Sequence, residues 1–366
     1  MRLAIIGTRG IPNNYGGFEQ ISEFLSVGLA ARGHEVSVYC SHNHPYQQLT
    51  WKGINLIHCY DPEYRLKTAG QFIYDLNCIR HARKAHFDVL LFMGYTSSSI
   101  WRRLFPKGSL IISNMDGLEW KRTKYSKPVQ RFLKYAEKLA VRHSHYHIAD
   151  SEVIKDDLAE RYQINCFYIP YGAGKQLAAN ESYLELYDVQ KNDYFMLMAR
   201  MEPENNIDMI LEGFANSGSS KTMVVVGNPE NTYGRYLRHK YLATANIKFI
   251  GSIFDQQLIH SLRAFSSIYF HGHSVGGTNP SLLEAMASGA LIAAHQNPFN
   301  QSILGGNGFY FSSSDDVSEI MTYIEKQKET LKIQSNLERI RTEFNWEKVI
   351  DQYDFLIRSS YKQFKL

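Results

Sequence analysis

The sequence predicts an α/β protein of two domains, each built on a parallel sheet with helices packed against it. The 366 residues exceed one domain of average size and suit two. Short apolar runs typical of buried strands alternate with amphipathic helical stretches along the chain. The alternation breaks off in a polar stretch over 175–193 and starts again at Tyr194, so we expect the domain boundary there.

The expected elements follow from this alternation. In the first half, strands are expected at 3–6, 35–40, 55–59, 89–93, 110–113, 147–150 and 166–170, and helices end near 31 and cover 70–84, 128–142 and 152–162. In the second half, strands are expected at 194–199, 222–226, 246–250, 267–270, 291–294 and 309–311. One helix is expected to begin after residue 200, and another is expected to end near residue 236. Further helices are expected at 255–264, 280–288, 316–328, 331–344 and 346–362.

The composition, 44% hydrophobic and 21% charged, is that of a globular protein. No apolar run approaches the roughly 20 residues of a membrane span, and the apolar part of the starting MRLAIIGTRG is too short for a signal peptide. Cys40, Cys59, Cys78 and Cys166 are too scattered for a metal site, and we expect no disulfides in a cytoplasmic protein. The net charge of +4 does not by itself indicate nucleic acid.

The stretch 270–294 predicts a binding site, because it combines a strand, a glycine-rich turn, a helix and a second strand. Asn279 is a good N-cap, and Pro280 suits the first helical position, where its missing N–H costs nothing. Gly276 and Gly277 let the backbone approach a ligand closely. The unpaired N–H groups and the dipole of a helix start favour an anion such as phosphate.

Glu284 lies one turn into that helix, between apolar residues. A buried carboxylate is costly unless other groups donate hydrogen bonds to it, and the two hydroxyls of a ribose would do so. Phosphate at the helix start and ribose at Glu284 together describe a nucleoside diphosphate. The alternative is a packed turn in which Glu284 pairs with a nearby arginine.

The segment VGGTNPSLLEA, 275–285, resembles the donor-nucleotide motif of the retaining GT-B glycosyltransferases of family 4, and more narrowly that of bacterial β-1,4-rhamnosyltransferases of polysaccharide biosynthesis. That family carries two glutamates with seven residues between them. Glu284 matches the second, and Gly276 stands where the first would be, as in this subgroup. The resemblance implies two Rossmann-like domains facing a cleft: an acceptor-side domain over 1–174, a nucleotide-sugar-binding domain over 175–345, and a terminal helix, 346–366, packed on the first domain.

A glycine-rich loop, GTRGIPNNYGGFE over 7–19, follows the first strand. It does not fit the G-x-G-x-x-G pattern, and the second strand ends in Cys40 without a carboxylate for an adenosine ribose, so we reject a dinucleotide site. The N–H groups of Gly16 and Gly17 would instead face a phosphate or the transferred sugar, and the loop resembles that of the rhamnosyltransferase subgroup. The alternative is an ordinary flexible loop.

Loops at the carboxyl ends of parallel strands are where open α/β sheets bind ligands. Asp116 follows the strand at 110–113, near the place where many family members have a histidine that faces the donor sugar. It would bind a sugar hydroxyl or assist the acceptor's proton, or else only cap an Asp-Gly turn. Arg200 follows the strand at 194–199, and its guanidinium matches a diphosphate in two-point fashion. Asn205 replaces the lysine that the family usually carries five residues later.

The family resemblance supplies further donor-site residues. Gly227 and Ile253 follow two more strands and would flank the base, or else form plain turns. The expected donor-binding set is Gly16, Gly17, Arg200, Asn205, Gly227, Ile253, Gly276, Gly277, Thr278, Asn279 and Glu284, and the expected catalytic set is Asp116, Arg200 and Glu284.

The segment from Lys121 to Arg142 is strongly basic, and Glu137 is its one acid. A basic amphipathic helix suits an anionic membrane surface. This fits the polyprenyl-pyrophosphate-linked saccharide acceptor that the resemblance implies. The alternative is a solvated helix face packed on the sheet. We do not expect nucleic acid as a partner, because no stacking aromatic residues line a basic groove.

The resemblance implies a retaining hexosyltransferase. We expect it to need no metal, since no D-x-D aspartate pair stands at a strand end. Our hypothesis is transfer of L-rhamnose from dTDP-rhamnose to a lipid-linked saccharide in capsule or O-antigen assembly, in the cytoplasm with peripheral contact to the inner face of the plasma membrane. The nucleotide sugar is a substrate, so no cofactor is expected. The alternatives are a hexosyltransferase that uses a UDP-sugar and a glycosyltransferase-like binding partner without turnover.

Overall fold

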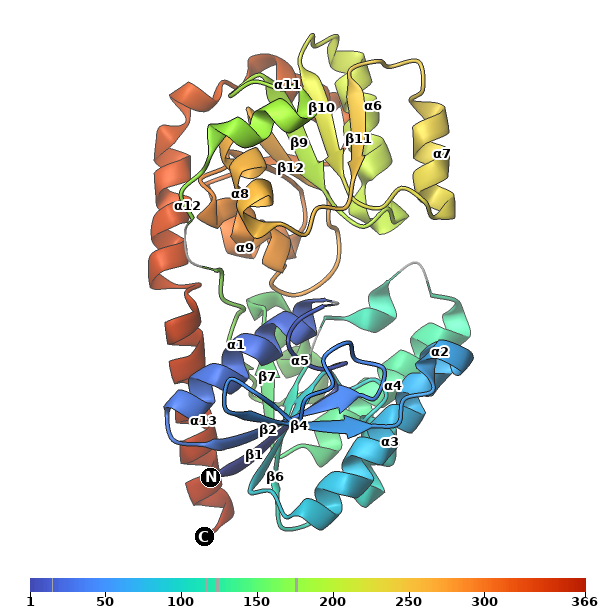
Figure 1. Ribbon diagram of the computed structural model, residues 1–366, viewed down its shortest axis with the longest axis vertical. Coiled ribbons are helices and arrows are strands. Elements are labelled where there is room, and N and C mark those ends of the chain that lie inside the picture. Colours follow the sequence, from blue (N-terminus) through green and yellow to red (C-terminus); the bar gives the residue numbers. More distant parts are fainter. Residues whose placement is uncertain (15, 116, 123–124, 175–176) are drawn as a thin grey trace. The chain divides into compact units, whose positions relative to one another are not determined.

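The computed structural model describes residues 1–366 except residues 15, 116, 123–124 and 175–176 (Figure 1). The chain divides into two compact units. The first contains Met1–Tyr171 together with Trp346–Leu366, and the second contains Gly172–Asn345. The chain therefore leaves the first unit once, builds the second, and returns to complete the first.

The first unit is built on a sheet whose described strands follow the order β3-β4-β2-β1-β5-β6-β7-β8. All neighbouring strands are parallel except β3 and β4. Strands β1, β2 and β5 are buried along nearly their whole length, as expected for a parallel sheet covered on both faces. The strands are β1 (Arg2–Ile6), β2 (Glu35–Ser41), β3 (Thr50–Trp51), β4 (Ile54–Cys59), β5 (Val89–Met93), β6 (Leu110–Asn114), β7 (Tyr146–Ala149) and β8 (Phe167–Tyr168).

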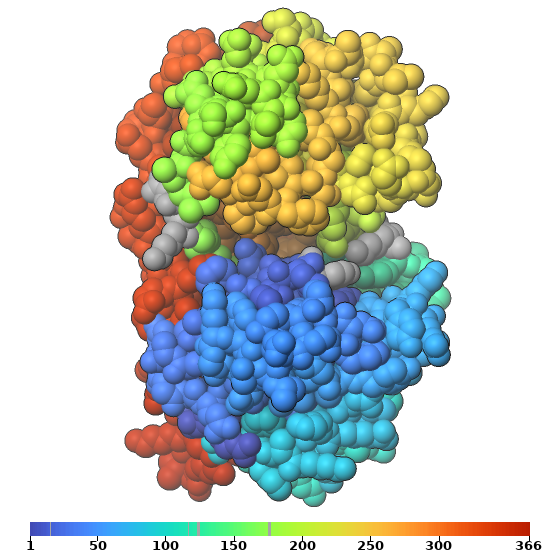
Figure 2. All heavy atoms as spheres, viewed as in Figure 1, coloured from blue at the N-terminus to red at the C-terminus, as the bar shows by residue number. Residues whose placement is uncertain are grey.

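Helices cover this first sheet. Tyr74, Cys78 and Ile79 of α3 pack on Ile6 and Phe92 of the strands. In the view with all heavy atoms, the blue segments of this unit form a continuous packed surface on this side (Figure 2). The helices and 3-10 turns are α1 (Gly17–Ala31), α2 (Glu63–Leu66), α3 (Thr68–Ala85), η1 (Ser99–Leu104), η2 (Glu119–Lys121), α4 (Lys127–His143), α5 (Glu152–Tyr162) and α13 (Trp346–Phe364).

Helix α13 is an integral part of the first unit, although it comes last in the chain. Trp346 stacks on Phe24 of α1 with ring centroids 4.4 Å apart. A Cβ on Gly28 would lie 2.4 Å from the side chain of Ile350, so α1 and α13 are in close contact there. The absence of a side chain at position 28 is what allows this approach.

The second unit is built on a parallel sheet whose described strands follow the order β11-β10-β9-β12-β13-β14. Its strands are β9 (Tyr194–Met198), β10 (Thr222–Val226), β11 (Ile247–Gly251), β12 (Ile268–His271), β13 (Ile292–His295) and β14 (Phe309–Phe311). Its helices and 3-10 turns are η3 (Glu181–Tyr187), η4 (Pro203–Asn205), α6 (Ile207–Ser217), α7 (Thr232–Lys240), α8 (Gln256–Phe265), α9 (Pro280–Ala287), α10 (Pro298–Leu304), α11 (Ser314–Tyr323), η5 (Lys326–Lys328) and α12 (Thr330–Thr342).

The apolar core of the second unit joins the strands to α6, α7 and α11. Phe214 of α6, Leu237 of α7 and Val317 of α11 meet Phe195 and Phe270 of the central strands. Helix α9 contacts α8 and α12 instead. The sheet is thus the middle layer of this unit (Figure 1).

The predicted α/β fold with parallel sheets is confirmed, but some local expectations are wrong, and the short helices α2 and α10 were not expected. The helix expected at 316–328 is interrupted, because α11 ends at Tyr323 and Ile324 adopts an extended backbone with its side chain against the core. The antiparallel strand β3 was missed, since two residues are too few to show a period.

No helix in the described part of the chain is long and apolar enough to cross a membrane. The four cysteines are buried and carry free thiols. Cys59 and Cys78 lie close enough together in the first core for their side chains to interact.

Asp75 is a buried carboxyl group on α3 that accepts a hydrogen bond from Ser97 Oγ at 2.6 Å. Burial, reinforced by the charge of Asp61, raises the pKa of Asp75 from 3.8 to about 7. Between these two values the folded protein holds a proton that the unfolded chain has lost. The free energy of unfolding therefore falls as pH rises through this window, and it levels off above about pH 7.

We expect Asp75→Asn to be more stable than the wild type at pH 8 and close to it at pH 4. The amide keeps the bond from Ser97 and cannot ionise, so the variant escapes a cost of about 1.4 kcal/mol per unit of pKa shift. Urea unfolding of both proteins at the two pH values measures this difference. A stability gain that is equal at both pH values would contradict an ionisation effect.

Candidate functional site

The glycine-rich turn between β12 and α9 forms the centre of the candidate site. Asn279 caps α9, because its Oδ1 accepts a hydrogen bond from the backbone N–H of Ser281 at 3.0 Å, and Pro280 occupies the first helical position. Both features were predicted from the sequence. Gly276 has a φ of +129°, and an added Cβ would meet no atom within 4 Å. The backbone at Gly276 therefore borders open space, with room for a ligand to approach it.

Two other glycines near the turn serve packing instead. A Cβ on Gly272 would lie 2.0 Å from the carbonyl oxygen of Asn205, and one on Gly227 would lie 2.2 Å from that of Ala199. Gly227, which has a φ of +147°, also donates its N–H to Gly251 O at 2.9 Å. The internal packing of the turn after β10 therefore accounts for Gly227 without a ligand.

Glu284 forms an ion pair with a buried arginine of α8. Arg263 is 2% exposed, and its Nη1 donates to Glu284 Oε2 at 2.9 Å. Burial opposes the charge of Arg263, but the Glu284 carboxylate outweighs it and the pKa of the guanidinium is raised. The arginine partner considered as the alternative for Glu284 is thus present. The Glu284 side chain nevertheless remains 24% exposed, so the carboxylate is accessible from solvent.

Further polar contacts hold Arg263 in place. Its Nη2 lies 3.3 Å from Ser281 Oγ, and this hydroxyl is 2.9 Å from Tyr269 OH. The guanidinium carbon lies 5.7 Å from the centre of the Tyr269 ring. Strand β12, helix α8 and helix α9 are therefore joined beneath the turn, which keeps the position of Glu284 defined.

His271 ends β12 and is completely buried. Neither of its ring nitrogens has a hydrogen-bond partner among the described residues. Its ring stacks on His273 with centroids 4.4 Å apart. Burial, together with His273 and Arg263, lowers the pKa of His271 well below its usual value, so the ring is neutral at pH 7.

We expect His271→Phe to raise the free energy of unfolding by about 1–3 kcal/mol, since it removes two buried polar atoms that lack partners. In the wild type the buried imidazole stays neutral at pH values where the same side chain is protonated in the unfolded chain. The free energy of unfolding therefore falls as pH drops below about 6.5. The variant should lose less stability over that range. Urea unfolding at pH 7.5 and 5.5 measures both effects, and a destabilised variant would contradict the assignment. A fall in activity despite a stable fold would place His271 in the functional site.

Arg200 follows β9 and is exposed. Its guanidinium forms no hydrogen bond or ion pair with any residue that the structure describes. Its carbonyl oxygen accepts from Glu202 N at 2.7 Å and from Asn205 Nδ2 at 2.8 Å. Asn205 is buried, and its amide nitrogen holds the loop that presents Arg200. The structure thus gives Asn205 a part in shaping this loop.

The predicted residues of the second unit gather at one edge of its sheet. Arg200 follows β9, Gly227 follows β10, half-buried Ile253 follows β11, and the turn from Gly276 to Asn279 follows β12. These four strands are neighbours, in the order β11-β10-β9-β12 (Figure 1). The carboxyl edge of a parallel sheet is where such proteins bind ligands.

The other predicted residues belong to the first unit. Gly16 is the N-cap of α1, with an extended backbone, and Gly17 is the first helical residue. Glu19, which the sequence did not single out, is buried and accepts hydrogen bonds from Thr8 Oγ at 3.2 Å and Arg9 N at 2.8 Å. Glu19 thus ties the glycine-rich loop to the helix. Asp116 lies outside the described residues.

Arg263, His271 and His273 were not predicted as site residues. A weak signal exists for Arg263, because it follows the buried Leu262 on a helix where Ile259 also faces inward, and a charge beside such a face needs a partner. Among the described residues, no group of three or more histidine, cysteine, aspartate or glutamate side chains is placed to hold a metal ion.

Two family models match the chain. Residues 1–174 match a domain of unknown function, DUF1972, and residues 187–340 match the glycosyl transferases group 1 family. Comparison with curated proteins gave no match.

Solved structures resemble the whole chain. Sucrose-phosphate synthase (tll1590) from Thermosynechococcus elongatus is 15% identical, with 99% of each chain covered and a TM-score of 0.81. Anabaena Alr3699/HepE, in complex with UDP and glucose, is 17% identical, with 98% of this chain and 99% of that chain covered and a TM-score of 0.76. A glycosyltransferase from Rickettsia africae ESF-5 is 13% identical, with 98% and 97% covered and a TM-score of 0.72. The chain therefore has the GT-B fold, and its residues 187–340 match the model of the glycosyl transferases group 1 family.

Proposed function

We propose that the protein transfers a sugar from a nucleoside diphosphate sugar that binds at the carboxyl edge of the second sheet. One observation carries this proposal: a cation and a helix start occur at the same edge of the sheet. Arg200 is a cation without a partner in the described structure, and the open turn at Gly276 leads into the capped start of α9. These groups follow neighbouring strands. Together they offer a guanidinium and helix N–H groups to a diphosphate.

The same groups would assist the chemistry. When the bond between the sugar and the diphosphate breaks, negative charge grows on the leaving phosphate oxygen. Arg200 and the positive end of α9 are in place before the reaction, so they stabilise this charge without reorganisation. The exposed part of the Glu284 carboxylate would accept hydrogen bonds from the ribose hydroxyls, while Arg263 fixes the orientation of the carboxylate. The proposal requires no metal ion.

The identity of the donor rests on two lines of support. The VGGTNPSLLEA segment resembles bacterial β-1,4-rhamnosyltransferases, which favours L-rhamnose from dTDP-rhamnose, transferred with retention of the anomeric configuration. HepE, which has a similar fold, has been solved with UDP-glucose. This favours the second candidate, a hexosyltransferase that uses a UDP-sugar.

The proposed acceptor is a saccharide linked to polyprenyl pyrophosphate. The basic segment that begins at Lys121 and ends at Arg142 supports it, because α4 exposes basic side chains next to Val129, Phe132 and Tyr135, which are 40%, 37% and 51% exposed. Such a helix suits peripheral contact with an anionic membrane.

A donor comparison tests the proposal. Thermal unfolding of the full chain is measured with dTDP, UDP and GDP, and transfer from the corresponding sugars to a polyprenyl-linked acceptor mixture is followed by mass spectrometry. We expect dTDP to stabilise most and dTDP-rhamnose to be the donor, with the product anomer determined by NMR. Preference for UDP would favour the second candidate. Binding of a nucleotide without turnover would indicate a non-catalytic partner, and binding of none would overturn the proposal.

A further inference from the structure

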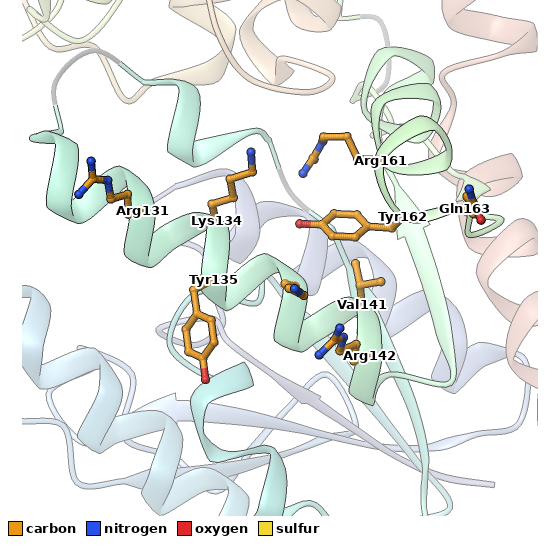
Figure 3. A pocket seen from close by; sticks show the side chains of 9 residues that line it. Arg131, Lys134, Tyr135, Val141, Arg142, Arg161, Tyr162 and Gln163 are labelled. Atoms are coloured by element: carbon orange, nitrogen blue, oxygen red, sulfur yellow. The ribbon is translucent and has the colours of Figure 1, made fainter.

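A basic pocket lies between α4 and α5 in the first unit, with a volume of about 660 Å³. Helix α4 contributes four cations to its wall, and α5 contributes Arg161 and Tyr162. Figure 3 shows Lys134, Arg161 and Tyr162 directed toward the same space beside α4. The four cations of α4 are Arg131, Lys134, Lys138 and Arg142.

The spacing of the four cations places them along one side of α4. They follow one another at intervals of three or four residues, which is the repeat of a helix face. All four are exposed, and none forms an ion pair with a described residue. Like charges at this spacing repel each other. The pocket therefore carries positive charge that no neighbouring acid in the described structure neutralises.

The acids near the pocket are already engaged. Glu137 is 1% exposed and accepts hydrogen bonds from Arg161 Nη1 at 2.5 Å, Tyr162 OH at 2.9 Å and Trp120 Nε1 at 3.2 Å. Asp157 accepts from Arg161 Nε at 2.6 Å and from Lys121 Nζ at 2.9 Å. These bonds fix Arg161 and Tyr162 at the pocket wall, so part of the site is ordered before any ligand arrives.

A second hollow of about 340 Å³ continues the pocket toward η2, because Arg131 and Lys134 line both. The Lys134 ammonium lies 4.7 Å from the centre of the Trp120 ring, which forms part of the wall of the second hollow. Two adjoining basic hollows suit two linked phosphate groups better than a single phosphate. Arginine binds phosphate oxygens in two-point fashion, and lysine adds point charges.

We propose that this α4–α5 pocket binds the diphosphate group of a polyprenyl diphosphate lipid. The inference rests on the lipid-linked acceptor of the proposed function, and it assigns the recognition of that acceptor's diphosphate to named residues. The exposed Val129 and Phe132 on the same helix favour a ligand at a lipid surface over a soluble diphosphate. The pocket would bind the lipid independently of the donor, whose proposed site lies in the other unit.

Vesicle flotation tests the proposal. Neutral phosphatidylcholine vesicles carry either undecaprenyl diphosphate or phosphatidylglycerol at equal total charge. We expect the full chain to bind the first at least about tenfold more tightly. The triple variant Arg131→Gln/Lys138→Gln/Arg142→Gln should bind the undecaprenyl diphosphate vesicles about 100-fold more weakly, from the loss of three charges near the lipid.

The matched control is Arg80→Gln/Lys84→Gln/Lys107→Gln, which removes three exposed basic residues of the same unit that form no ion pair with described residues. It should bind like the wild type. Equal losses in the two triple variants, or equal binding to both vesicle types, would overturn the proposal by showing an effect of net charge only. Binding of inorganic pyrophosphate that matches the lipid's would overturn the choice of a lipid ligand.

Donor binding separates this result from the proposed function. The pocket variant should keep the wild-type thermal shift with dTDP, because its substitutions lie outside the second unit. If the wild type binds the diphosphate lipid but no nucleotide, the pocket stands and the proposed function fails. If nucleotide binding and transfer to a soluble acceptor hold while lipid selectivity is absent, only the pocket assignment fails.

Discussion

Arg200→Ala is expected to lower the turnover number for sugar transfer by about 100- to 1000-fold, the range seen when one preorganised group that stabilises a developing oxyanion is removed. The guanidinium is exposed and has no partner in the described structure, so its loss should change the free energy of unfolding by less than about 0.5 kcal/mol. Initial rates with the nucleotide sugar and thermal unfolding of the same preparations measure both quantities.

Two variants sharpen this result. Arg200→Lys keeps the charge but loses the two-point geometry, so its rate should fall between those of the wild type and the alanine variant. Arg80→Ala removes another exposed arginine without an ion pair among the described residues and should leave the rate unchanged. A normal rate for Arg200→Ala would remove the main electrostatic support for donor binding at this edge.

Glu284→Ala is expected to destabilise the protein by about 3–5 kcal/mol, because it leaves the buried Arg263 charge without its carboxylate. Adding Arg263→Met should restore most of this loss, since a buried ion pair can often be replaced by apolar side chains at little cost. Met198 already contacts the guanidinium through its sulfur, so the side chain introduced by Arg263→Met would have an apolar neighbour. Urea unfolding of the wild type, the single variants and the double variant completes the cycle.

Nucleotide binding then separates the two roles of Glu284. If the carboxylate holds the ribose, the double variant should fold well but bind the nucleoside diphosphate about 10- to 100-fold more weakly, the effect of losing hydrogen bonds to a charged group. Isothermal titration calorimetry measures this affinity. Wild-type affinity in the stable double variant would show that the Arg263–Glu284 pair is only structural.

The elements that the sequence predicted well are those decided by neighbours in the chain. The strands at 89–93, 222–226 and 309–311 have the expected bounds, because each is a compact apolar or β-branched run between turn residues. At the caps Asn279 and Ser151, the side-chain oxygen accepts a hydrogen bond from the backbone N–H two residues later. Local chemistry of this kind can be read directly from the order of residues.

The parts that escaped prediction depend on contacts between distant segments. An arginine partner for Glu284 was considered as an alternative, but its identity was not predicted, because Arg263 lies 21 residues away and comes near only when α8 and α9 pack together. The donation from Asn205 to the Arg200 carbonyl depends on the shape of a single loop, which the order of residues does not reveal. His271 ends β12 and its ring stacks on His273 of the following loop, and the residue order gives no reason to expect that neither ring nitrogen of His271 has a hydrogen-bond partner among the described residues.

The return of the chain to the first unit has a consequence for biosynthesis. Residues 1–171 leave the ribosome first, yet the surface of α1 around Phe24 and Gly28 stays uncovered until Trp346 and Ile350 have been translated. Gly172–Asn345 is continuous and has its own core, so it can reach its native state before the unit that precedes it in translation. A nascent chain released before residue 346 would expose an apolar surface that chaperones and proteases recognise.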